Sequence, residues 1–246
     1  SYNSMLAKIN DLIQLTEKQE RQKREAELRT LQAQIKPHFL YNTLDTISWM
    51  ARKRGAEDVS EMVEALSRLF RIGLSKGNEF IPLAEEFDHV RYYLQIQKQR
   101  YQNKLQYELD LDPAIAHLPV LKVILQPIVE NAIYHGIKER RGPGVIVVRG
   151  ERDGDRIRLT VADDGVGMDA DKLTRLRRRL ERASAVRPAD SPAAAGETES
   201  RSGYGLVNVL ARLKLTYGAD KCDVTVDSEP GRGTKVTLIY PVPEEE

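Results

Sequence analysis

The first third of the chain has the hydrophobic periodicity of helices. Residues 1–33 contain no proline and no glycine and are rich in Glu, Lys, Gln, Arg and Leu, which favour helix. Apolar side chains fit a coiled-coil seam in two sets that do not share one heptad phase: Met5, Ile9 and Leu12, then Leu28, Leu31 and Ile35. We therefore predict a parallel dimeric coiled coil with a register break, or alternatively a solvated helix whose period drifts.

The helical period continues beyond Pro37, and a turn at residues 52–56 leads into a second amphipathic helix. The apolar positions of the two helices are Leu40, Leu44, Ile47 and Ala51, then Val59, Met62, Val63, Leu66 and Phe70. One hairpin cannot bury both faces, so two copies are expected to form a four-helix bundle with His38 near its outer surface. After a loop at residues 75–81, Pro82 is expected to open a third helix that runs to about Gln99.

The second half changes to the alternation of strands. Strands are predicted at residues 105–111, 145–150, 156–162, 223–226 and 235–240, and Asp153-Gly154 predicts a hairpin between the second and third. Helices are expected from Pro119, over a very basic stretch at residues 169–182, and at residues 206–215. Residues 183–202 lack apolar anchors and are predicted to be mobile. The fold class is therefore α+β: a helical part followed by an α/β layer.

Composition removes several classes of protein. The 246 residues carry 38 basic and 37 acidic side chains, so a net charge of +1 gives no electrostatic reason to expect nucleic acid as a partner. A single cysteine, Cys222, excludes an internal disulfide framework. No run of about 18 apolar residues is present, and no signal peptide. The chain begins in mid-helix pattern, so we expect a soluble fragment of a longer protein.

His38 is the first candidate for chemistry. Neutral imidazole is a competent nucleophile, and a large share of histidine is neutral near pH 7. Pro37 cannot donate to the carbonyl of Ala33, which predicts a kink just before His38, and Asn42 lies one helical turn beyond it. The alternatives are that His38 caps or packs the helix and that Asn42 only hydrogen-bonds the kinked helix.

Three further constellations lie in the second half. Glu130-Asn131, followed by His135, offers an amide oxygen that Mg²⁺ accepts beside phosphates, and a carboxylate that could hold a metal-bound water or act as a base. Asp163-Asp164-Gly165-Val166-Gly167 follows a strand, where a carboxylate can accept a bond from an exocyclic amine; the alternative is an ordinary turn. Gly203, Gly205 and Leu206 open a helix whose N-terminus suits phosphate, with the stretch before it as a possible lid.

The order and spacing of these three motifs resemble the ATP-binding domain shared by gyrase, Hsp90, MutL and the histidine kinases, known as the Bergerat or GHKL fold. The match runs from about Lys104 to Pro243 and includes Gly233-Thr234. The stretches Gln34–Leu44 and Leu83–Arg100 look like the corresponding segments of LytS-like sensor histidine kinases. Residues 1–16 look like the tail of a HAMP helix.

The resemblance implies three domains: a signalling coiled-coil helix at 1–33, a dimerisation and phosphotransfer domain at 34–100, and an ATP-binding catalytic domain at 101–246. It implies that His38 takes the γ-phosphoryl group of ATP, that Asn131 binds Mg²⁺ and that Asp163 binds the adenine amine. The remaining nucleotide contacts that it implies are His135, Gly165, Gly167, Gly203, Gly205, Leu206 and Thr234, while Asn42 supports dephosphorylation. It further implies a homodimer at the cytoplasmic face of a membrane, which passes phosphate to an aspartate of a response regulator.

Two positions depart from the pattern. Many histidine kinases carry an acidic residue where Phe39 stands, and many carry a lysine where Tyr134 stands. These changes bear on the rate of autophosphorylation, and His135 or Arg201 could replace the missing phosphate contact. They also leave open the alternative that the chain is an ATP-gated dimerisation module, which binds nucleotide and a partner but transfers no phosphoryl group. A serine/threonine kinase on the same fold is disfavoured by the His38 segment.

Overall fold

A computed structural model of the chain describes residues 37–74, 79–185 and 204–243. The predicted coiled coil at residues 1–33 and the predicted kink at Lys36 lie outside the described residues. So do Gly203 and most of the stretch that was expected to be mobile. Ala183 and the two residues after it are the exception, because they form the last turn of a helix.

The first described unit is a helical hairpin, α2 (Pro37–Lys53) and α3 (Glu57–Gly73). Its interior is made of small and apolar side chains, and Leu44, Ala51 and Ala65 are buried. Hydroxyl groups also bridge the two helices: the Oγ atoms of Ser48 and Ser60 lie 2.9 Å apart, and the Ser67 hydroxyl donates to Asp45. The hairpin predicted from the apolar periodicity is confirmed.

The third helix, α4 (Leu83–Tyr101), packs against the remainder of the chain as well as against α3. Its side chains Leu83, Phe87, Val90 and Leu94 are buried in the same apolar core as the sheet. Pro82 is the last residue of a short strand, β1 (Phe80–Pro82), and precedes the helix rather than beginning it.

The helix predicted to begin at Pro119 is wrong. Pro119 begins β3 (Pro119–Leu121), which pairs antiparallel with β1. Helix α5 (Gln126–Asn131) begins five residues after that strand, with Pro127 in its first turn, and continues into a π-helical turn at Ala132–Ile137. Pro127 therefore supplies the helix-starting signal that the sequence pattern assigned to Pro119.

A five-stranded sheet follows, in the order β2-β4-β5-β7-β6. The strands are β2 (Leu105–Leu111), β4 (Gly144–Asp153), β5 (Arg156–Asp163), β6 (Asp223–Glu229) and β7 (Gly233–Pro241). Strands β2 and β4 are parallel and the other pairs are antiparallel. All five predicted strands and the Asp153-Gly154 hairpin are confirmed, since their alternating pattern reflects one buried face.

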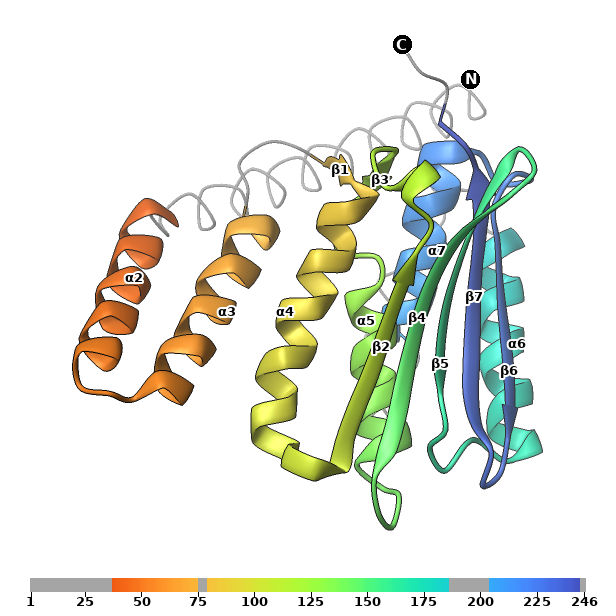
Figure 1. Cartoon of the computed structure of the whole chain (residues 1–246). Helices are drawn as coiled ribbons and strands as arrows, with labels where there is room; N and C mark the ends of the chain where they lie inside the picture. Colours follow the sequence, from red (N-terminus) through yellow and green to blue (C-terminus); the bar gives the residue numbers. More distant parts are fainter. Residues whose placement is uncertain (1–36, 75–78, 186–203, 244–246) are drawn as a thin grey trace, which may run out of the picture.

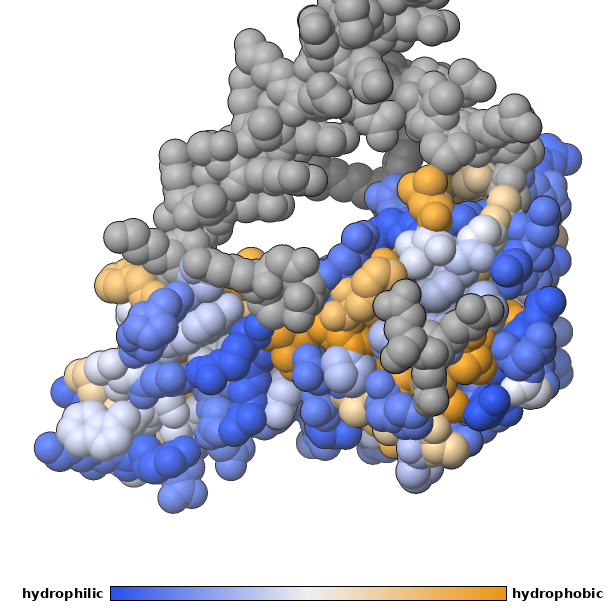
Figure 2. All heavy atoms as spheres, turned by 90° about the horizontal axis from the view of Figure 1, so that it is seen from above, coloured by the Kyte–Doolittle hydropathy of each residue, from blue (hydrophilic) through white to orange (hydrophobic). Residues whose placement is uncertain are grey.

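Helices α4, α5, α6 (Ala170–Ala185) and α7 (Tyr204–Tyr217) lie on one side of this sheet (Figure 1). Short 3₁₀ turns at Gln102–Lys104 and Pro113–Ile115 flank β2. In the view from above, hydrophobic residues gather nearer the middle of the molecule, and the hairpin side is largely hydrophilic (Figure 2). The result is the predicted α+β architecture, a helical part followed by a two-layer mixed α/β unit.

One buried carboxylate fixes the start of α5. Glu86 of α4 is fully buried and accepts hydrogen bonds from the backbone N–H groups of Val123, Ile124 and Leu125, at 2.7, 2.8 and 2.8 Å. Burial raises the pKa of this carboxyl, and the three N–H groups oppose that rise. Leu125 is the N-cap of α5, and helix N-termini leave such N–H groups unpaired, so Glu86 acts as a cap supplied from another helix. It also holds the two N–H groups of the turn that precedes the helix.

Candidate functional site

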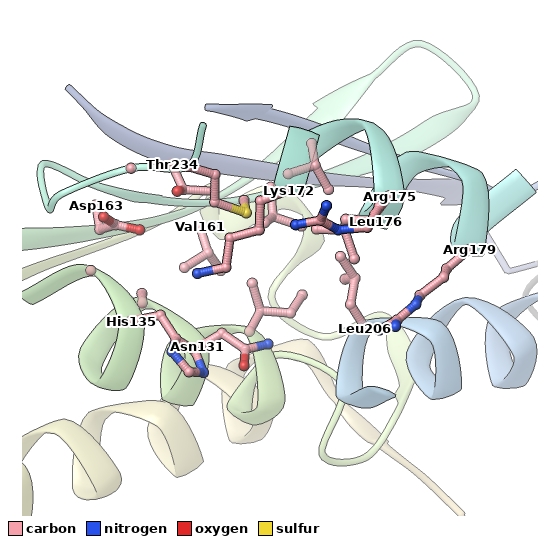
Figure 3. Close-up of a pocket in the computed structure, with 17 residues that line it drawn as sticks. Asn131, His135, Val161, Asp163, Lys172, Arg175, Leu176, Arg179, Leu206 and Thr234 are labelled. Atoms are coloured by element: carbon pink, nitrogen blue, oxygen red, sulfur yellow. The ribbon is translucent and has the colours of Figure 1, made fainter. Parts of the chain in front are cut away.

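A cavity of about 510 Å³ opens between the helical layer and the sheet. Side chains from α5, the π-helical turn, β5, α6, α7 and β7 surround it (Figure 3). Its lining includes Ile128, Asn131, Ala132, His135, Gly136, Val161, Asp163, Gly167, Met168, Lys172, Arg175, Leu176, Arg179, Leu206, Val226, Thr234 and Val236. An apolar body with a few polar groups is typical of small-molecule sites.

Asp163 ends β5 and lies at one end of this cavity. Its Oδ1 accepts a hydrogen bond of 2.9 Å from the Gly165 N–H. Burial raises the pKa of Asp163 to about 6, the N–H groups of Gly165 and Thr234 lower it, and the neighbouring Asp164 raises it further. At neutral pH the carboxylate is mostly ionised and can accept a bond from a ligand N–H.

The neighbouring Asp164 makes structural contacts with other segments of the chain. Its Oδ1 accepts from the Val145 N–H at 2.7 Å, and its Oδ2 lies 2.8 Å from the guanidinium of Arg140. Both oxygens are therefore engaged in joining β5 to β4 and to the segment after the π-helical turn. Only the first carboxylate of the Asp-Asp pair faces the cavity.

Two glycines bring the π-helical turn against the end of β5. A Cβ on Gly165 would lie 2.4 Å from the backbone of Gly136, and a Cβ on Gly136 would lie 2.5 Å from Oδ1 of Asp163. The Val166 N–H donates to the Gly136 carbonyl across this contact. Any side chain at either position would push the carboxylate or the turn away.

Asn131 and His135 line the opposite wall, one helical turn apart. The turn between them is π-helical, with the Lys138 N–H donating to the Ile133 carbonyl at 2.8 Å. Such turns recur at functional sites because they re-aim side chains. Glu130, by contrast, is not among the cavity-lining residues, and its carboxylate accepts a hydrogen bond of 2.7 Å from Gln126.

The other predicted positions divide into three groups. Gly167, Leu206 and Thr234 line the cavity. Gly165 supports it from behind, and Gly205 lies where an added Cβ would be 3.1 Å from Pro127. Gly203 is outside the described residues.

The sequence interpretation missed the cations of α6. Lys172, Arg175 and Arg179 line the cavity, although residues 169–182 were expected only to be a basic helix. Their spacing of three and four residues places them on one helical face, which is the signal that could have identified them.

His38 lies on α2, on an element separate from the cavity, and its side chain is exposed. The Nδ2 of Asn42 lies 3.2 Å from Nδ1 of His38. Among the described residues Nε2 has no hydrogen-bond partner. Phe39, next in the chain, is 71% exposed. The structure therefore brings His38 and Asn42 together and leaves the outer ring nitrogen open.

The described part of the chain contains neither a metal-binding cluster nor a membrane-spanning helix. No group of three or more His, Cys, Asp or Glu side chains there could hold a metal ion. No described helix is long and apolar enough to cross a membrane.

Comparison with known proteins identifies the family of the chain. Residues 26–105 match the histidine kinase family, and residues 119–244 match the histidine kinase-, DNA gyrase B- and HSP90-like ATPases. The chain is 32% identical over 98% of its length to the sensor histidine kinase YesM of Bacillus subtilis, covering 37% of that protein. It is 32% identical over 92% of its length to the sensor histidine kinase BtsS of Escherichia coli, covering 35%.

A third relative is the sensor protein LytS of Enterococcus faecalis, 30% identical over 91% of this chain and 35% of that protein. The resemblance to LytS-like sensor histidine kinases is thus confirmed, and the chain spans about a third of the length of these relatives. The chain belongs to the family of histidine kinase-, DNA gyrase B- and HSP90-like ATPases.

Proposed function

We propose that this chain is the kinase part of a two-component sensor histidine kinase, which phosphorylates His38 with ATP and passes the phosphoryl group to an aspartate of a response regulator. The observation that carries the proposal is the pairing, in one chain, of two features. One is a cavity with an ionised acceptor, Asp163, at its end, and the other is an exposed histidine whose Nδ1 is held by Asn42.

The cavity chemistry suits ATP. Asp163 accepts from the exocyclic amine of adenine, and Gly165 and Gly167 let backbone approach the ring. Thr234, Leu206, Gly205 and Gly203 complete the walls in this proposal, and His135 contacts phosphate. The side-chain oxygen of Asn131 lines the cavity and fits Mg²⁺, which prefers one or two protein ligands beside phosphates and water. Bound Mg²⁺ would neutralise phosphate charge during transfer.

At His38 the reaction forms a bond from Nε2 to the γ-phosphorus and breaks the bond from that phosphorus to the ADP oxygen. Attack by Nε2 needs its lone pair, so the ring proton must sit on Nδ1. As an NH₂ donor to a bare Nδ1, Asn42 would leave the ring proton on Nε2, so attack requires the amide to rotate until its oxygen accepts from Nδ1–H. Phosphorylation then makes the ring cationic, and the Nδ1 proton is lost to water.

Glu130 was expected to act as a base or to hold a metal-bound water. Its Oε1 accepts a hydrogen bond from Gln126, and Glu130 is not among the residues that line the cavity. The residue after His38 is Phe39, whose side chain cannot act as a general base.

The wider arrangement is part of the same proposal. Residues 1–33 serve as a signalling helix, residues 34–100 as the dimerisation and phosphotransfer domain, and residues 101–246 as the catalytic domain. The protein acts as a homodimer at the cytoplasmic face of the membrane, attached through a segment outside this chain. The partners are a second copy and a response regulator.

The proposal is tested with ATP labelled at the γ-phosphate. We expect the full chain to acquire label that is lost in acid and kept in alkali, as phosphohistidine is. His38→Ala should remove all label while ATP binding, measured by calorimetry, is unchanged. Acid-labile label on the variant would reject His38 as the acceptor. ATP binding without any label on the unchanged protein would favour the nucleotide-gated dimerisation module.

A further inference from the structure

The π-helical turn at Ala132–Ile137 has different surroundings on its two sides. His135 and Gly136 line the cavity (Figure 3). Tyr134, the residue before them, is not among the lining residues and is 37% exposed. Its hydroxyl instead meets the hydroxyl of Tyr93 on α4. Tyr134 therefore supports the turn from outside the cavity.

Tyr93 forms the α4 side of this contact. Its side chain is buried, and burial, followed by the nearby Glu130 carboxylate and Tyr134, raises the pKa of its hydroxyl. Tyr93 thus stays a neutral phenol, and it shares a hydrogen bond with the Tyr134 hydroxyl. Because Tyr93 is buried, the loss of this bond would leave a polar group without a partner. The contact therefore ties the π-helical turn to α4.

A second contact holds the end of the same turn. Lys104 ends the 3₁₀ turn that follows α4, and its Nζ donates to the Lys138 carbonyl at 2.8 Å. Lys138 is the C-cap of the π-helical turn, and its own Nζ lies 5.9 Å from the centroid of the Tyr134 ring. Carbonyl groups at the end of a helix lack partners within it, so a lysine is a suitable donor there. We call Tyr93, Lys104 and Tyr134 the turn clamp.

The other side of the turn rests on the end of β5. Gly136 fits against the Asp163 carboxylate only because it has no Cβ, and its carbonyl accepts from the Val166 N–H at 3.3 Å. The turn is thus held between α4 and β5. A π-helical turn is wound more widely than an α-helical one, so relaxation towards the α-helical form would change the direction in which Gly136 faces.

We propose that the turn clamp is a positioning device: by fixing the π-helical turn, Tyr93, Lys104 and Tyr134 keep Gly136 against Asp163. This inference rests on the proposed function, because it takes Asp163 to bind the adenine base. The three clamp residues do not line the cavity, so their effect on the ligand passes through the turn. A displaced turn would admit water to the Asp163 carboxylate, and that water would compete with the adenine amine.

The test measures adenosine binding to the full chain by calorimetry from pH 5 to 8. Tyr93→Phe and Tyr134→Phe each remove one hydroxyl and keep the ring. Each should weaken adenosine at pH 8 by roughly two- to tenfold, the range expected for one lost hydrogen bond. Each should also lower the pH at which adenosine affinity falls, because a more hydrated Asp163 loses part of the burial that raises its pKa to about 6.

Two further variants complete the test. The double variant should bind adenosine no more weakly than the single ones, because both substitutions remove the same bond. Lys104→Met, which removes the second contact, should weaken adenosine and lower the same pH.

Tyr101→Phe is the matched control. Tyr101 ends the same helix, and its hydroxyl is buried without a hydrogen-bond partner within the described ranges. Its removal should change neither the adenosine affinity nor its dependence on pH.

Three outcomes overturn the inference. They are an unchanged adenosine affinity in both tyrosine variants, a loss of affinity with no shift in its pH dependence, and losses that add in the double variant. Failure of the proposed function looks different, because the unchanged protein would then bind no adenosine at any pH.

Discussion

At the scale of single residues, Asp163 and Asp164 show how position decides chemistry. The two carboxylates are adjacent, yet Asp164 uses both oxygens on Val145 and Arg140, whereas Asp163 accepts from Gly165 through Oδ1 and lines the cavity. Burial raises the pKa of Asp163 to about 6, so its ionisation is sensitive to mild acid. Two predictions follow from that value.

The first concerns binding. An ionised Asp163 accepts the adenine amine, and a protonated one does not accept it as well. Adenosine affinity should therefore hold above pH 7 and fall as the pH drops through about 6. Adenosine is the right probe because it has no phosphate that titrates in this range. Calorimetry from pH 5 to 8 measures the adenosine affinity, and an affinity that does not change with pH would show that Asp163 does not bind the adenine base.

The second concerns stability. The pKa of Asp163 in the folded protein, about 6, lies above its reference value of 3.8, so protonation of this carboxyl stabilises the folded state. This contribution to the free energy of unfolding is fully present below about pH 4 and is lost as the pH rises through about 6. Asp163→Asn should therefore stabilise the ligand-free protein at pH 7 by on the order of 1 kcal/mol, or about 2–4 °C in Tm. The same variant should bind adenosine more weakly. Differential scanning calorimetry at pH 7 decides it, and a lower Tm would contradict the argument.

Asn42 gives a third prediction at this scale. Its amide lies 3.2 Å from Nδ1 of His38, and we propose that it also reaches the space where a phosphoryl acceptor would dock. Asn42→Ala should still label His38 and transfer phosphate, at a reduced rate because the ring is no longer oriented, but should lose phosphatase activity toward the response regulator.

The three activities and the Tm should be compared on purified protein. Asn42→Asp, which can still accept from a protonated Nδ1, should restore labelling more than phosphatase activity. An unchanged phosphatase rate in Asn42→Ala would end the idea that this amide positions water.

At the scale of elements, the placement of α5 depends on a residue far away in sequence. Glu86 of α4 caps three N–H groups at residues 123–125, where Val123 adopts a φ of 59°. Removing the carboxylate would leave those buried donors without partners. Since α5 carries Asn131 and leads to His135, removal of the Glu86 carboxylate should disturb the positions of these cavity residues as well as the core.

We expect Glu86→Ala to destabilise the protein by about 3–5 kcal/mol and Glu86→Gln by about 1–2 kcal/mol, because glutamine keeps one acceptor oxygen. Urea unfolding measures both. A matched control is Glu85→Gln, the neighbouring acidic residue of the same helix, which is less buried and should have little effect. Equal small losses for all three variants would show that the cap is dispensable.

This element also shows where prediction from sequence stops. Alternating residues gave the strands directly, because one face of each is buried, and the apolar period gave α2 and α3. Pro119 was misassigned because a proline marks both strand ends and helix starts, and the pairing of β3 with β1 is not local. The cap by Glu86 and the position of Lys172, Arg175 and Arg179 at the cavity depend on contacts between distant segments, so the local sequence pattern revealed neither.

At the scale of the whole molecule, the hairpin leaves apolar surface without cover. Ile47 and Met50 of α2 and Val59 and Met62 of α3 are 43%, 46%, 45% and 39% exposed. These four lie at one level of the hairpin, beside the Ser48–Ser60 contact. Neighbouring apolar side chains in water are costly, so a second copy that buries them would be stabilising.

The last prediction is that this surface forms the homodimer. A charge in place of Ile47 or Met62 would be buried without a partner in a four-helix bundle, so Ile47→Glu and Met62→Glu should each convert the dimer to a monomer. Sedimentation equilibrium over a range of concentrations measures the mass. Leu215→Glu is the matched control, because Leu215 is 65% exposed on α7, outside the hairpin, and its replacement should leave the dimer intact. Adenosine affinity should be the same in all three variants, since neither the hairpin nor Leu215 is among the residues that line the cavity. A mass that stays at two chains after both hairpin substitutions would show that the copies associate elsewhere.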